Sequence, residues 1–76
     1  MISAKQAAQK AAVYLQEIKS VYDVSLEEIE LSDNERYWLV TLSYSSNSLL
    51  SSNQEPWKIF KVDAETGKVL SMKSRE

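Results

Sequence analysis

The 76-residue chain contains no cysteine and no histidine, and it has one glycine and one proline. Without cysteine it forms no disulfide and offers no thiolate nucleophile. Without either residue type it lacks the ligands of Cys/His zinc sites, and without histidine it lacks the commonest general base. We therefore expect no catalytic, cofactor-binding or metal-binding residues.

Basic residues are also few, since 9 Lys and Arg stand against 11 Asp and Glu, for a net charge of −2. This balance provides no basic surface for a phosphate backbone, so we expect no nucleic-acid partner. No run approaches the roughly 20 apolar residues that span a bilayer. Because the N-terminus lacks the apolar core of a signal peptide, the expected location is cytoplasmic, although a removed export signal would leave the same sequence.

The length predicts one domain over residues 1–76, and a domain of this size buries only about 60% of its unfolded surface. Domains below about 80 residues often depend on a disulfide, a metal or a partner subunit. With no cysteine or histidine, self-association is the remaining source of additional stability. A homodimer is therefore one expectation.

Helical spacing marks the first part of the chain. Ser3 and Gln6 form a capping-box pattern, which predicts a helix over about residues 3–20. Its apolar stripe consists of Ala4, Ala7, Ala8, Ala11, Leu15 and Ile18. Because alanine dominates the stripe, the helix can lie close to a sheet.

Alternating apolar residues predict four strands, over about 25–32, 36–45, 57–64 and 68–73. The side chains expected to face the helix are Trp38, Val40, Leu42, Tyr44, Phe60, Val62 and Ala64. In the last strand we expect Leu70 and Met72 in the core rather than Val69. Residues 45–56 are rich in serine and asparagine and predict a long mobile loop. The predicted fold is α+β, with one N-terminal helix packed on a four-stranded antiparallel meander in two layers.

The single glycine lies in the stretch 62–70, between two β-prone runs. Gly67 is expected to take a positive φ at the end of a short hairpin loop, where Asp63 accepts hydrogen bonds from the turn backbone.

Three segments together resemble the PepSY domain: the alanine-rich start of the helix, the Tyr-Trp-Leu-Val-Thr-Leu strand at 37–42, and above all the hairpin at 60–70. The resemblance implies a helix on an antiparallel meander. It also implies a module of the kind found in propeptides of thermolysin-like metallopeptidases and in bacterial surface or spore proteins, with an inhibitory or regulatory role. It implies no catalytic residues.

One helix covers only one face of a four-stranded sheet, so the strand parity leaves a candidate protein interface on the other face. Its expected members are Tyr37, Leu39, Trp57 and Ile59. Leu49 and Leu50 in the serine-rich loop are a second candidate contact. They either dock a partner, anchor the loop, or fold back over the sheet and cover the first patch.

The acidic residues could also be read as a carboxylate pair or a cation site, formed by Glu27, Glu28, Glu30, Asp63 and Glu65. Solvation of an exposed strand face and capping of a turn explain them more simply. A Ser/Lys pair such as Ser71 with Lys73 or Lys58 is a further arrangement to weigh as a nucleophile. We therefore expect a non-catalytic binding or regulatory module that contacts a protein partner or itself. The alternatives are an inhibitor or immunity-type protein for a peptidase or toxin and, more distantly, an enzyme using carboxylates or Ser/Lys.

Overall fold

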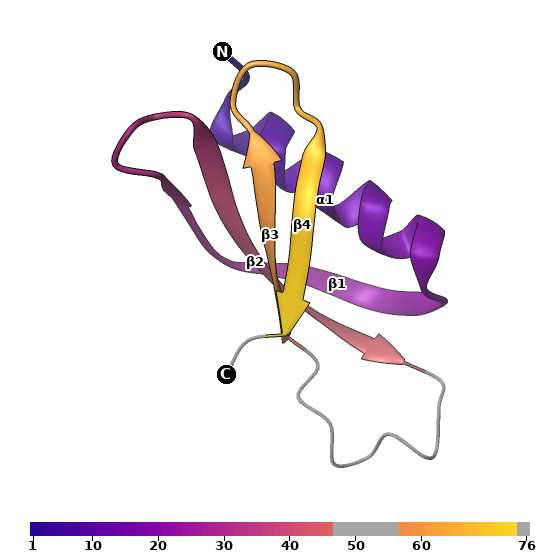
Figure 1. The fold of residues 1–76 in the computed structure, drawn as a ribbon. Coiled ribbons are helices and arrows are strands. Elements are labelled where there is room, and N and C mark those ends of the chain that lie inside the picture. The colour runs from indigo at the N-terminus through magenta and orange to yellow at the C-terminus, as the bar shows by residue number, and fades with distance from the viewer. Residues whose placement is uncertain (47–56, 75–76) are drawn as a thin grey trace.

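The computed structural model describes residues 1–46 and 57–74. In this part of the chain, α1 (Ala4–Ile18) is followed by β1 (Val21–Leu31), β2 (Tyr37–Ser46), β3 (Trp57–Asp63) and β4 (Val69–Ser74) (Figure 1). The strands form an antiparallel sheet in the order β1-β2-β3-β4, and α1 packs against all of them. The predicted α+β fold, a helix on a four-stranded meander, is confirmed. Most of the predicted loop, residues 47–56 including Leu49 and Leu50, lies outside the described residues.

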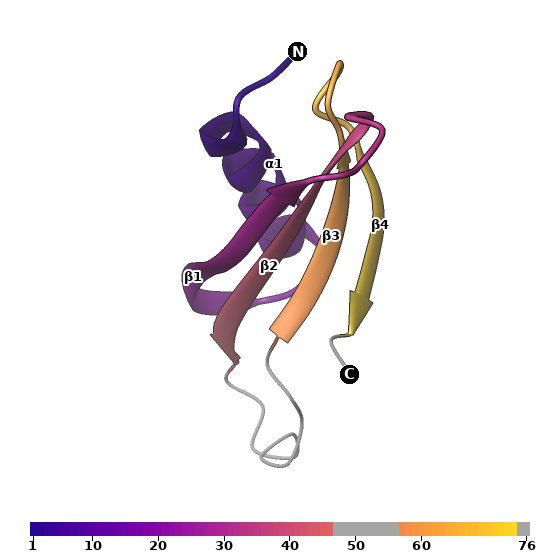
Figure 2. The same ribbon diagram turned by 90° about the vertical axis from the view of Figure 1, so that its left-hand side faces the viewer.

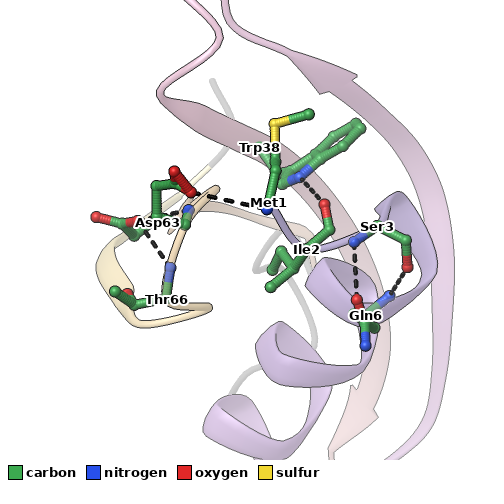
Figure 3. Close-up of polar contacts among 8 residues, drawn as sticks. Met1, Ile2, Ser3, Gln6, Trp38, Asp63 and Thr66 are labelled. Carbon is green, nitrogen blue, oxygen red and sulfur yellow. Dashed lines mark hydrogen bonds and ion pairs between the residues drawn. The ribbon is translucent and has the colours of Figure 1, made fainter.

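The helix begins with the capping box expected from the sequence. The Ser3 hydroxyl accepts a hydrogen bond from the Gln6 N–H at 3.1 Å, and the Gln6 side chain accepts one from the Ser3 N–H at 2.8 Å (Figure 3). The helix ends at Ile18, slightly before the predicted end, because Lys19 already has extended backbone angles. No helix among residues 1–46 and 57–74 is long and apolar enough to cross a membrane.

The core lies between α1 and one face of the sheet. Three helix residues, Ala7, Ala11 and Leu15, are fully buried. They recur every four positions and so form one stripe along the helix. The sheet side chains buried against this stripe are Val40, Leu42, Phe60 and Val62, which confirms the predicted parity of β2 and β3.

The first strand begins earlier than predicted, at Val21 rather than near residue 25. Val21 and Val24 both pack against the core, although simple alternation would place them on opposite faces. The β1–β2 register shifts between Tyr22 and Ser25, and Asp23 takes a positive φ of 55° there. This irregularity inserts a residue into β1 and returns both valines to the core side.

The prediction for the last strand was wrong at one position. Val69 packs against the core, whereas Leu70 is 44% exposed. The register pairs Val62 with Val69 and Lys61 with Ser71, so Leu70 is an inserted residue, as in a β-bulge. Met72, which pairs across from Phe60, lies on the core side as predicted.

This register predicts that truncating Val69 and truncating Leu70 will lower the free energy of unfolding by different amounts. Val69→Ala should lower the free energy of unfolding by about 1 kcal/mol, because it removes methyl groups packed against the core. Leu70→Ala should change it by less than about 0.5 kcal/mol. Urea unfolding followed by circular dichroism measures both values, and a larger loss in Leu70→Ala would contradict the shifted register.

Candidate functional site: the open sheet face

The two faces of the sheet differ in what covers them. Figure 2 shows α1 along one face, and no other described element lies on the opposite face, which we call the open face. Two rows of cross-strand neighbours run across the centre of the open face from β1 to β4. The first row consists of Glu28, Thr41, Ile59 and Lys73. The second row consists of Glu30, Leu39, Lys61 and Ser71.

The four strand residues predicted as an interface all belong to the open face, and each is partly buried. Leu39 and Ile59 lie in adjacent rows on neighbouring strands, at the centre of the face. Tyr37 lies beyond Leu39 along β2, and the Lys61 ammonium sits 4.6 Å from the centre of its ring. Trp57 pairs with Ser43 at the opposite end of the face. The aromatic residues therefore flank an aliphatic centre and do not stack on each other.

Sequence reasoning missed Thr41, which lies between these residues. Its side chain is only 5% exposed, although no described element covers this face. In the cross-strand register Thr41 lies between Glu28 and Ile59, and Leu39 and Ser43 are its nearest neighbours of the same parity on β2. Among the described residues of the open face, Thr41 is the only one that is buried. The alternation of β2 would have placed Thr41 on this face, but its burial follows from the register.

Charged groups on the open face are separated by sign. Glu28 and Glu30 are exposed on β1, whereas Lys61 and Lys73 occupy β3 and β4. The carboxylate of Glu27, also on β1, accepts a hydrogen bond from the Ser43 hydroxyl at 2.6 Å. The face thus has an acidic side, an aliphatic centre and a basic side.

At one end of the sheet, the β3–β4 turn is held by Asp63. Its carboxylate accepts hydrogen bonds from the N–H groups of Glu65, at 2.7 Å, and Thr66, at 3.0 Å (Figure 3). These bonds, led by the one from Thr66, hold the pKa of Asp63 below its ordinary value. Gly67 has a φ of 80° and donates its N–H to the Asp63 carbonyl oxygen at 2.8 Å.

The start of the chain packs against this turn. Ile2 donates its N–H to the Ala64 carbonyl oxygen at 2.7 Å and accepts a hydrogen bond from the Trp38 indole N–H at 3.2 Å (Figure 3). A Cβ placed on Gly67 would lie 3.2 Å from Cε of Lys10 and 3.6 Å from Cδ1 of Ile2. The glycine therefore serves both the positive φ and the close approach of the helix.

Comparison with known proteins agrees with this architecture. The family described as PepSY, Peptidase propeptide and YPEB domain, matches residues 1–73. The chain belongs to the PepSY family. No curated protein matches the chain, and no solved structure does.

The carboxylates weighed as a chemical site do not gather in this PepSY domain. Within residues 1–46 and 57–74, no three Asp or Glu residues are placed to hold a metal ion together. The Asp63 carboxylate is engaged by the turn backbone. The Lys58 ammonium donates to the Ser74 hydroxyl at 2.8 Å. Lys58 therefore pairs across the strands with Ser74, whereas Ser71, the serine weighed as its partner, pairs with Lys61.

A shallow depression lies where the β1–β2 turn meets the β3–β4 turn. It is lined by Met1, Glu35, Arg36, Tyr37, Asp63, Glu65, Thr66 and Leu70. The Met1 amine lies 3.7 Å from a Glu65 carboxylate oxygen across this region, and both groups are well exposed to water. The depression therefore presents charged groups of both signs to solvent.

The lowered pKa of Asp63 predicts how the stability of the PepSY domain depends on pH. A carboxylate whose pKa is lower in the folded state stabilises it above the unfolded pKa, and this contribution is lost as pH falls through the folded pKa. Unfolding midpoints should therefore fall as pH drops below about 4. Asp63→Asn, which keeps an oxygen acceptor but no charge, should have a smaller dependence in that window. Carbon-13 NMR titration of the Asp63 carboxyl tests the cause, and a pKa at or above the ordinary value would contradict it.

Proposed function

We propose that this PepSY domain is a non-catalytic binding or regulatory module, and that it contacts proteins through its open face. The observation that carries the proposal is the arrangement of that face. Leu39, Thr41 and Ile59 form a closely packed centre, and exposed charges lie on either side. An apolar centre with a polar rim is the usual anatomy of a protein–protein interface.

The flanking aromatic residues support the same function. Tyr37 and Trp57 lie at opposite ends of the aliphatic centre, and tyrosine and tryptophan are enriched among residues that dominate binding energy. Lys61 stacks over Tyr37 and so holds its ring in a defined position before any partner arrives. An ordered side chain loses less conformational freedom on binding.

The proposed interface predicts which variants lose their partners. The double variant Leu39→Thr with Ile59→Thr places β-branched residues, which favour strands, at both positions but removes apolar surface from the open face. Captured from an extract of the source cells, its bound proteins should lack those retained by the wild type. Val13→Thr, which alters a side chain that is 53% exposed on α1, is the matched control and should retain them. Identical captured proteins for the double variant and the wild type, with both proteins folded by NMR, would contradict the proposal.

A second candidate function is inhibition of a peptidase or toxin by the same face. The family description, which includes peptidase propeptides, favours it. The PepSY domain should then slow cleavage of a peptide by a thermolysin-like metallopeptidase in proportion to its concentration. The double variant Leu39→Thr with Ile59→Thr should inhibit at least about tenfold less, the loss expected for a central interface residue. Equal rates with and without the wild-type domain would remove this candidate for that class of peptidase.

A further inference from the structure

The ends of one row on the open face carry opposite charges. Glu28 begins the row on β1 and Lys73 ends it on β4, with Thr41 and Ile59 between them. Both charged residues are exposed, and in the described part of the chain neither forms an ion pair. The row therefore pairs a negative end with a positive end across an uncharged centre.

We propose that a second copy of this chain occupies the open face, stacked face to face about a two-fold axis that runs along the strands. This inference rests on the proposed docking function of the face and names its partner. Such an axis reverses the strand order, so β1 of one copy lies over β4 of the other. Glu28 of each copy then faces Lys73 of the other, and Thr41 faces Ile59.

Charge selects this axis over the alternative. A two-fold axis running across the strands would place β1 of one copy over β1 of the other. Glu28 and Glu30 of one copy would then face the same glutamates of the other copy. Like charges facing each other across an interface disfavour it. A partner of a single charge sign would meet attraction on one side of the face and repulsion on the other. A second copy in the proposed orientation meets attraction on both sides.

The edges of the sheet favour stacking of faces over pairing of strands. The β1 edge contains two register shifts, and the β4 edge contains the one at Leu70. Irregular edges of this kind oppose the addition of another strand. The faces of two twisted sheets, by contrast, pack at an angle of about 30°, with their side chains interdigitated.

The size of the face predicts a reversible dimer. Four strands about 4.8 Å apart and about seven residues long span roughly 450 Å² per copy. Two copies would bury roughly 900 Å² in total, which is below the roughly 1,200 Å² of stable complexes and in the range of weak, transient ones. Association should therefore depend on concentration between about 10 µM and about 1 mM.

Sedimentation equilibrium of single charge reversals tests the proposal. Glu28→Lys and Lys73→Glu should each weaken dimerisation at least about tenfold, because each places two like-charged pairs in the interface. They move the net charge from −2 in opposite directions, to 0 and to −4. If net charge alone controlled association, one variant would dimerise more strongly than the wild type and the other more weakly. Glu17→Lys and Lys5→Glu on α1 make the same changes in net charge and should leave dimerisation unaffected.

Two mixtures test the orientation. The two single variants mixed in equal amounts should form a heterodimer, and the double variant Glu28→Lys with Lys73→Glu should dimerise like the wild type. Wild type and double variant together should sort into separate homodimers by native mass spectrometry, because a mixed dimer would face like charges at both ends. Mixed dimers in excess over the homodimers would overturn the proposed axis.

A wild type that stays monomeric up to about 1 mM would overturn the inference, as would dimerisation that neither single variant weakens. The proposed docking function has its own test in the capture by Leu39 and Ile59 variants. The wild type could be monomeric and still capture proteins that the Leu39 and Ile59 variants do not. That result would overturn self-association and support docking of another protein on the open face.

Discussion

One helix packs against one face of the sheet, and this constraint determines the character of both faces. Ala7 and Ala11 carry only methyl groups, so α1 can approach the sheet closely and cover Val40 and Phe60. The helix has no second stripe with which to cover another surface. No other described element covers the opposite face, on which Thr41 is buried while Leu39 and Ile59 stay partly exposed.

The hairpin that carries the family resemblance also connects the two layers. Its turn is held internally by Asp63 and approached from outside by Ile2, which precedes α1, and by Lys10, in the middle of α1. Ile2 joins the turn to Trp38 on β2 through its N–H and its carbonyl oxygen. Gly67 leaves room at this point for the side chains of Lys10 and Ile2.

Local patterns in the sequence predicted much of this fold. The Ser3–Gln6 capping box and the alternation of β2 are short-range signals, and the structure confirms both. The wrong placement of Leu70 and the shared core side of Val21 and Val24, which alternation does not predict, have a common cause. An inserted residue changes strand parity, and Asp23 and Leu70 give no glycine or proline signal of an insertion.

The candidate site could also be predicted only in part from the sequence. Alternation alone placed Leu39 and Ile59 on one face. The burial of Thr41 and the row from Glu28 to Lys73 depend on the register between strands, which a single sequence does not specify. The separation of charge around the aliphatic centre is therefore a property of the assembled sheet.

The central claim is that the open face is a docking surface whose partner is a second copy. An isotope-filtered NOE experiment on a mixture of labelled and unlabelled chains, at about 1 mM, tests it most directly. The account predicts intermolecular NOEs between the Ile59 methyl groups of one copy and the Leu39 methyl groups of the other, because both side chains are partly exposed on the central strands. Intermolecular NOEs confined to α1, or none at that concentration, would contradict it.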